Sequence, residues 1–140
     1  MTYKMEYRVM ELPDGYDITM NSPANVENFL RERFSPVQEE MHLMCMNIKN
    51  RVILHRVIAR GAYNTLSIEP REIFIPVLTN CCKNFIIAHN HPSNDTSPSK
   101  EDIIMTKKLE KGCGYVGLNM LDHLIFTADD AYSFKKHGLI

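Results

Sequence analysis

The chain has 140 residues, of which 44% are hydrophobic and 24% are charged, a composition typical of an ordinary globular domain with its own core. Sixteen Lys and Arg side chains against seventeen Asp and Glu give a formal net charge of −1. This balance excludes a strong overall basic field for nucleic acid, although a local basic patch is still compatible with it. The N-terminus lacks the apolar stretch of a signal peptide and no apolar run could span a membrane, so we expect a cytoplasmic protein.

The four cysteines do not indicate a disulfide framework or a zinc knot. Cys45, Cys81, Cys82 and Cys113 show no C-x-x-C spacing, and a reducing compartment disfavours disulfides. We therefore expect buried or half-buried thiols.

The distribution of apolar residues predicts helices and strands in alternation. Ser22 and Pro23 are typical of a helix start, and Lys49-Asn50 is a compact polar turn between two apolar runs. Pro76 is expected to kink the second helix. The predicted helices cover residues 23–33, 67–81 and 98–111, and the predicted strands cover residues 7–12, 39–48, 51–59, 85–89, 115–119 and 121–127.

Two further expectations concern the C-terminal third of the chain. Gly112 and Gly114 are expected to end the third helix, and residues 128–130 to cap a final helical turn. The resulting order predicts an α/β fold, a mixed β-sheet flanked by helices. We expect a single domain over residues 1–140, with an N-terminal lead and helix in residues 1–34 and the core in residues 35–140.

The strongest functional pattern lies at the end of one predicted strand. The apolar run Phe85–Ala88 leads into His89 and His91, whose side chains point to the same face because strand residues alternate. Pro92 marks the end of the strand, and the following loop starts a helix that carries Asp102 in its first turn. Two imidazoles and a carboxylate make a three-ligand metal site, and a catalytic zinc site typically leaves its fourth position to water.

A hydrolytic metal site also needs a general base near the attacking water. Glu39 and Glu40 stand at the start of the strand predicted to neighbour the histidine strand. Alternation assigns one of them to each face of the sheet, and spacing alone does not choose between them.

These residues together resemble a known metallopeptidase motif. Glu39, His89-x-His91 and Ser99-x-x-Asp102 are similar to the JAMM (MPN+) motif, and the local sequence is closer still to the RadC family of bacterial proteins. The similarity runs from about Ser35 to the end of the chain. The matching segments are His89-Asn-His-Pro-Ser93, Thr96-Ser-Pro-Ser-Lys-Glu-Asp102, Asn47-Ile-Lys-Asn-Arg51, Gly61 with Asn64, Pro70-Arg71-Glu72 and Leu121-Asp122-His123-Leu124. Counting back from Asn47, the resemblance assigns the motif's glutamate to Glu39.

The resemblance implies a JAMM/MPN-like fold, a cytidine-deaminase-like sandwich, and a role for each matched residue. His89, His91 and Asp102 would bind one Zn²⁺ per chain, and Glu39 would be the base that activates water. Ser99 would steady the tetrahedral oxyanion. The implied reaction is hydrolysis of a peptide or isopeptide bond in a protein or peptide substrate.

The sequence departs from the family pattern at a few positions. Glu69 replaces the aromatic residue or His often seen before Pro-Arg-Glu, and Asn90 stands between the histidines as in RadC proteins, where eukaryotic JAMM enzymes usually have Ser or Thr. The helix-hairpin-helix segment that often precedes this domain in longer RadC proteins is absent from the sequence. Its absence weakens the expectation of DNA contact.

Two of the motifs also have structural interpretations. Ser99-x-x-Asp102 fits a helix capping box, which competes with metal binding for Asp102. Asp122-His123 fits either support for the metal ligands or, the interpretation we favour, a structural pair within a strand.

Three functional hypotheses follow. The first is a JAMM-type zinc metallopeptidase, and the second is a RadC-type accessory protein in DNA repair, recombination or mobile-element biology, acting through nucleic-acid or protein binding. The third is a binding module without chemistry, which the intact set of site residues disfavours. A basic helix face formed by Lys107, Lys108 and Lys111 is more typical of a solvated surface than of a phosphate contact. Neither the physiological substrate nor the oligomeric state follows from the sequence.

Overall fold

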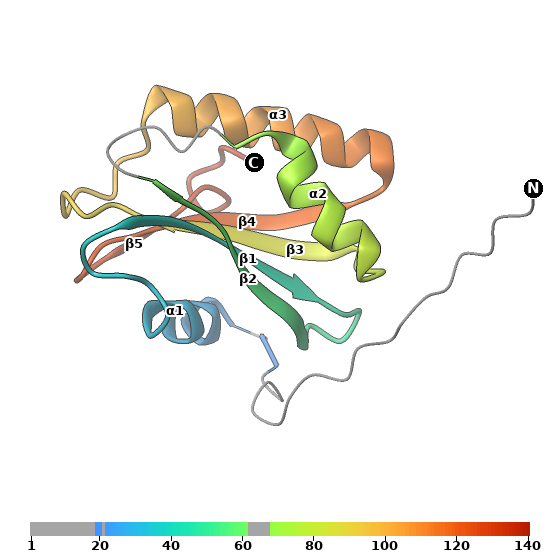
Figure 1. Cartoon of the computed structure of the whole chain (residues 1–140), viewed down its shortest axis with the longest axis horizontal. Coiled ribbons are helices and arrows are strands. Elements are labelled where there is room, and N and C mark those ends of the chain that lie inside the picture. The colour runs from blue at the N-terminus through green and yellow to red at the C-terminus, as the bar shows by residue number, and fades with distance from the viewer. Residues whose placement is uncertain (1–18, 21, 62–67) are drawn as a thin grey trace, which may run out of the picture.

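The computed structural model describes residues 19–20, 22–61 and 68–140. These residues form a five-stranded mixed sheet with helices on both faces (Figure 1). This arrangement confirms the predicted α/β class. The helices are α1 (Pro23–Arg31), α2 (Pro70–Thr79) and α3 (Lys100–Val116). The strands are β1 (Glu39–Met46), β2 (Val52–Gly61), β3 (Asn84–Asn90), β4 (Asn119–Phe126) and β5 (Ala131–Ser133).

The sheet has the strand order β2-β1-β3-β4-β5, and its topology brings the start of β1 beside the end of β3. β1 is antiparallel to both β2 and β3, and Met41 pairs with His89. β3 and β4 are parallel, with α3 as their crossover connection, and β5 is antiparallel to β4. The carboxyl ends of two parallel strands and the amino end of β1 therefore meet at one edge of the sheet.

Both faces of the sheet are covered, which explains the nearly continuous apolar runs of β1 and β3. Figure 1 places α1 on one face and α2 with α3 on the other. The cluster on the α2–α3 face includes Leu43, Ile73, Val77, Phe85, Ile87 and Leu109. The cluster on the α1 face includes Val26, Phe29, Leu30, Met44 and Ile86.

The starts of the first two helices follow local capping signals. Ser22 accepts a hydrogen bond from the backbone N–H of Asn25, so the predicted helix from residue 23 is confirmed. α2 begins at Pro70 with a capping box between Glu69 and Glu72, and it continues through Pro76 to Thr79. The predicted strand at residues 7–12 and the predicted helix residues before 68 lie outside the described residues.

The prediction for the end of α3 was wrong. The helix runs through Gly112 and Gly114 to Val116, and Gly117 ends it in the left-handed conformation with φ of 73°. Residues 115 and 116 are therefore helical rather than the start of a strand. The predicted final helical turn is replaced by β5, where residues 131–133 pair with β4. Gly112 serves helix packing rather than helix termination: a Cβ there would lie 2.8 Å from the Phe74 ring of α2, a contact that the sequence does not show.

The cysteines are free thiols, and their burial partly differs from expectation. Cys45, Cys82 and Cys113 are buried, whereas Cys81 is exposed at the end of α2. Its φ of 55° places it in the left-handed region, just after the helix ends.

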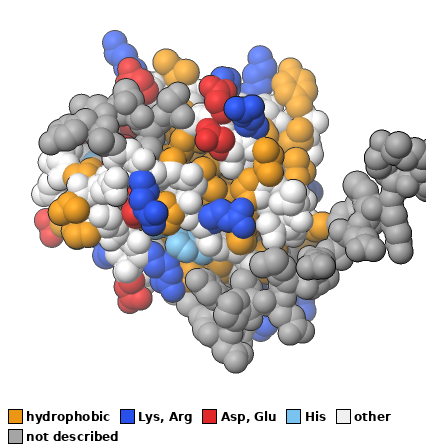
Figure 2. Space-filling model, viewed as in Figure 1, with side chains coloured by type: hydrophobic (Ala, Val, Ile, Leu, Met, Phe, Trp, Pro, Cys, Tyr) orange, Lys and Arg blue, Asp and Glu red, His pale blue; other side chains and the backbone are white. Residues whose placement is uncertain are grey.

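The surface shows no large area of one charge on the face seen in Figure 2, where acidic and basic side chains are interspersed. Among the described residues, no helix combines the length and apolar character needed to cross a bilayer.

Candidate metal centre

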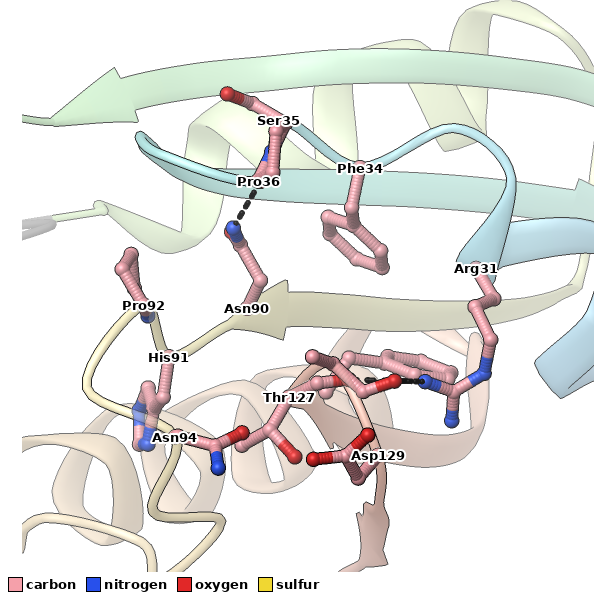
Figure 3. Close-up of a pocket in the computed structure, with 12 residues that line it drawn as sticks. Arg31, Phe34, Ser35, Pro36, Asn90, His91, Pro92, Asn94, Thr127 and Asp129 are labelled. Atoms are coloured by element: carbon pink, nitrogen blue, oxygen red, sulfur yellow. Dashed lines mark hydrogen bonds between the residues drawn. The ribbon is translucent and has the colours of Figure 1, made fainter.

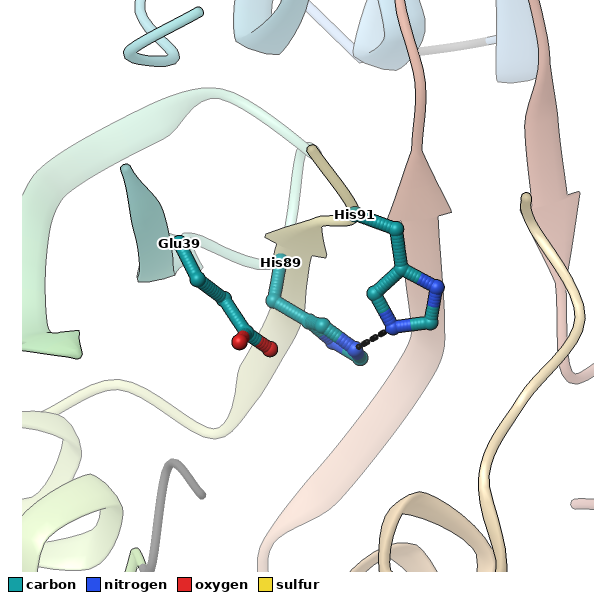
Figure 4. A group of neighbouring side chains, drawn as sticks. All are labelled: Glu39, His89 and His91. Carbon is teal, nitrogen blue, oxygen red and sulfur yellow. Dashed lines mark hydrogen bonds between the residues drawn. The ribbon is translucent and has the colours of Figure 1, made fainter. Parts of the chain in front are cut away.

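Two histidine rings face each other at the carboxyl end of β3 (Figure 4). His91 directly follows β3, and its N–H still bonds to the Phe126 carbonyl at 2.7 Å, so its side chain projects to the same side as that of His89. Their Nε2 atoms are 2.9 Å apart. His89 is buried, and His91 is partly exposed at the edge of the sheet.

A glutamate and an aspartate approach these rings from two other elements. Glu39, the first residue of β1, reaches across from the neighbouring strand (Figure 4), and the ligand atoms of Glu39, His89 and His91 all lie within 4.8 Å of one another. Asp102 comes from the first turn of α3, with Oδ1 3.3 Å from His89 Nε2 and Oδ2 3.4 Å from His91 Nε2. Two imidazoles and two carboxylates from β1, β3 and α3 thus converge.

Glu40 lies outside this group, as strand alternation requires. It is buried among polar partners and accepts a hydrogen bond from the Ser35 backbone N–H. Its carboxylate oxygens are 2.9 Å from His42 Nε2 and 2.9 Å from Arg60 Nε. The structure therefore places Glu39, rather than Glu40, beside the two histidines.

The capping box at the start of α3 is formed, and it coexists with the approach of Asp102 to the histidines. Ser99 Oγ accepts from the Asp102 backbone N–H at 3.0 Å, and Asp102 Oδ2 accepts from the Ser99 N–H at 2.9 Å. The two interpretations of Asp102 are compatible, because the cap orients the same carboxylate that faces the histidines. Ser99 is exposed and serves the cap as an acceptor, an arrangement that does not test the oxyanion role.

The electrostatics of the site hold Asp102 in its ionised form beside the two imidazoles. Burial raises the pKa of the Asp102 carboxyl, but the adjacent His89 and His91 imidazoles outweigh it and hold that pKa well below its usual range. Burial lowers the pKa of His91, yet the Asp102 carboxylate and the Asp95 carbonyl together raise it above the ordinary value. His91 Nδ1 lies 2.7 Å from the Asp95 carbonyl, which can only accept, so Nδ1 carries a proton and Nε2 presents its lone pair when the ring is neutral. Such a group attracts a cation.

Two buried residues, His123 and Thr106, lie behind His89, and only His123 was considered from the sequence as a support for the metal ligands. His123 is buried, and its Nε2 is 2.8 Å from His89 Nδ1. Its Nδ1 is 2.6 Å from Thr106 Oγ1. The contact favours the supporting interpretation of His123, whereas Asp122 holds the C-terminal segment through Ser133 and Lys135. No sequence signal pointed to Thr106, a single threonine within a helix.

Asn90 fastens the segment before β1 to the end of β3. Its side-chain amide donates to the carbonyls of Ser35 at 2.8 Å and Gln38 at 2.9 Å, and its Oδ1 accepts from the Glu40 N–H at 2.7 Å. These bonds position Glu39, which lies between Gln38 and Glu40. The sequence identified Asn90 only as the residue that RadC proteins carry between the two histidines, and it did not predict these hydrogen bonds.

A cavity of about 390 Å³ adjoins the site on the side of His91 (Figure 3). It lies where β3 and β4 end, the edge at which ligands commonly bind in open α/β sheets. Arg31 donates to the carbonyls of Thr127 at 2.8 Å and Ala128 at 2.9 Å, which secures one wall. The other residues that line the cavity include Phe34, Pro36, Pro92, Phe126 and Asp129.

The chain matches the family model described as the RadC-like JAB domain over residues 20–139. It belongs to the RadC-like JAB domain family. Similar relatives are UPF0758 proteins of Aquifex aeolicus (strain VF5), 32% identical over 123 residues, and of Desulforamulus reducens (strain ATCC BAA-1160 / DSM 100696 / MI-1), 32% identical over 134 residues. A third, from Clostridium botulinum (strain Okra / Type B1), is 35% identical over 139 residues.

This RadC-like JAB domain spans little more than half the length of those relatives. The alignments cover 88%, 95% and 98% of the chain but 53%, 59% and 60% of the respective relatives. The geometry gives a candidate metal-binding triad of Glu39, His89 and His91. With Asp102 beside it, the donor set is nitrogen and oxygen only, which suits zinc and neighbouring divalent metals.

Proposed function

We propose that this RadC-like JAB domain is a zinc-dependent hydrolase of JAMM type that cleaves a peptide or isopeptide bond. The observation that carries the proposal is the convergence of four donor side chains at one edge of the sheet, with two imidazole Nε2 atoms 2.9 Å apart. Two imidazole Nε2 atoms this close, beside two carboxylates, are stabilised by a positive charge between them, which either a shared proton or a bound metal ion can supply.

The proposed ligands are His89, His91 and Asp102. Both Asp102 oxygens face an imidazole Nε2, and the Ser99 backbone N–H fixes the orientation of the carboxylate. Zinc, when bound, supplies a Lewis acid that polarises a carbonyl and lowers the pKa of water.

Glu39 is the proposed general base. It approaches from β1, a different element from the three ligands, and its carboxylate reaches the same space as the two Nε2 atoms. In the proposed reaction it takes a proton from the attacking water and returns it to the leaving amine as the C–N bond breaks. The Ser99 hydroxyl, whose proton the cap does not need, would donate to the oxyanion.

The cavity beside His91 is the proposed place for the substrate chain next to the scissile bond. Its wall combines the apolar surfaces of Phe34 and Pro92 with the carboxylate of Asp129 (Figure 3). The backbone loop at Thr127 is held by Arg31, so this side of the cavity is preformed.

The test combines metal analysis with a cleavage assay. Purified protein should hold about one zinc per chain, and His89→Ala and Asp102→Ala should lose it while the exposed control His137→Ala keeps it. Internally quenched peptide libraries and a lysine-linked isopeptide serve as substrates. Glu39→Gln should retain zinc and lose cleavage, whereas Glu101→Gln, which alters an exposed carboxylate in the first turn of α3, should retain both.

Each outcome separates one part of the proposal from another. Loss of zinc in Glu39→Gln would make Glu39 a ligand rather than the base, and full cleavage by that variant would remove it from the chemistry. A wild-type protein that takes up no zinc at neutral pH would refute the enzyme and favour the accessory role in DNA repair or recombination.

A further inference from the structure

A chain of buried polar groups runs behind His89, outside the four donor side chains. His89 Nδ1 lies 2.8 Å from His123 Nε2, and His123 Nδ1 lies 2.6 Å from Thr106 Oγ1. Thr106 Oγ1 lies 2.7 Å from the backbone carbonyl of Asp102. His123 and Thr106 have exposed fractions of 0% and 1%, so water does not satisfy these groups.

The direction of the protons along this chain follows from its far end. The Asp102 carbonyl oxygen can only accept, so the single hydroxyl proton of Thr106 is donated there. The oxygen of Thr106 must then accept the Nδ1 proton of His123. His123 has no exposed surface, and its two ring nitrogens face Thr106 and His89 rather than a carboxylate, so the ring holds a single proton, the one on Nδ1. Its Nε2 therefore carries a lone pair that accepts the Nδ1 proton of His89.

We propose that His123 and Thr106 are positioning residues that hold His89 in the Nδ1–H tautomer and so present its Nε2 lone pair to the metal. This inference rests on the metal site proposed above. The reversed direction would place two oxygen lone pairs 2.7 Å apart at Thr106 and a proton on His89 Nε2, where it would block coordination.

The same series of hydrogen bonds also connects α3 with β3, the elements that supply the ligands Asp102 and His89. Thr106 bonds the backbone of Asp102, and the Asp102 carboxylate returns to His89 with Oδ1 3.3 Å from Nε2. The loop of contacts closes through α3, β4 and β3, so a shift of His123 would move the two ligands relative to each other. Groups behind metal ligands commonly change metal affinity by about 10–100-fold when removed.

A purely structural function is the alternative that the experiment must separate. His123 stacks on Phe134 with ring centroids 4.4 Å apart and 11° between the planes, so its replacement could simply disturb packing. Thr106 offers a cleaner pair of variants. Thr106→Val keeps the shape but removes the hydroxyl, whereas Thr106→Ser keeps the hydroxyl and loses one methyl group.

The first measurement is zinc affinity by competition with a chelator, with the unfolding midpoint of the zinc-free protein measured beside it. Thr106→Val should weaken zinc binding about 10-fold or more, and Thr106→Ser should stay within about 3-fold of wild type. The second is the ¹⁵N spectrum of the imidazoles in the zinc-free protein at mildly alkaline pH. Wild type and Thr106→Ser should carry the His89 proton on Nδ1, and Thr106→Val should shift it toward Nε2.

The outcomes distinguish this inference from the proposed function. If wild type binds no zinc, the proposed function fails, and the tautomer of His89 in the two variants still decides the inference. If wild type binds zinc and Thr106→Val binds it equally with the His89 tautomer unchanged, the positioning role is overturned. Loss of stability in Thr106→Val without loss of zinc affinity would also overturn it, because packing alone would then explain the threonine.

Discussion

Gly112 of α3 lies against the Phe74 ring of α2, and adding one methyl group there should cost stability. A Cβ at Gly112 would lie 2.8 Å from Phe74 Cε2 and 2.9 Å from Cζ, well inside the ~3.5–4.0 Å at which carbon atoms pack. Gly114 lies in the same helix, and a Cβ there would meet nothing within 4 Å. The two glycines therefore form a matched pair that differs in tertiary contact.

Replacing glycine by alanine in α3 has two effects on the free energy of unfolding, a gain in helix propensity and, at Gly112, a loss from overpacking. Alanine is favoured over glycine inside a helix by about 1 kcal/mol, so Gly114→Ala should stabilise the protein by about 0.5–1 kcal/mol. The same gain applies to Gly112→Ala, but displacing the partly buried Phe74 ring is an overpacking change that costs about 1–3 kcal/mol. We expect Gly112→Ala to be neutral to about 2 kcal/mol destabilising, and at least about 1 kcal/mol less stable than Gly114→Ala.

Urea unfolding followed by circular dichroism, with the metal content held constant, measures both variants. Phe74→Leu removes the two ring atoms that the methyl group added by Gly112→Ala would meet, so the double variant should recover part of the loss in a double-mutant cycle. Equal stabilisation by Gly112→Ala and Gly114→Ala would refute the reasoning and show that α2 does not press on α3 at this point.

Two further predictions concern buried polar networks. Asn90→Ala should lower the free energy of unfolding by about 2–3 kcal/mol, because it leaves three backbone groups without their partner. Asn28→Ala, at an exposed position of α1, should change it little. Equal urea midpoints for the two variants would contradict this prediction. For His55, burial and the adjacent His42 lower the pKa from 6.5 to about 4. Unfolding therefore takes up a proton between these values, and stability should fall as the pH drops through this window. Partial exposure limits the effect to about 1–2 kcal/mol, and urea titrations at several pH values should show that His55→Phe flattens the dependence; an unchanged slope would exclude His55 as its source.

Local patterns in the sequence determined most of the elements and part of the site. The Ser22-Pro23 start, the apolar runs of β1 and β3, and the Ser99-x-x-Asp102 spacing depend on neighbours within a few residues. Period-two alternation was enough to place His89 and His91 on one face. The resemblance to RadC proteins added Glu39, which spacing alone could not choose over Glu40.

The tertiary structure decided what depends on contacts between distant segments. Glu39 faces the histidines because β1 runs antiparallel to β3 in a register that pairs Met41 with His89. The α3 helix continues past Gly112 and Gly114, and the missing side chain at Gly112 leaves room for Phe74, a residue 38 positions earlier. His123 reaches His89 across 34 positions of sequence, and Thr106 completes that contact from another element. Such contacts leave no periodic trace in the sequence, since they are set by strand order and helix packing rather than by local propensity.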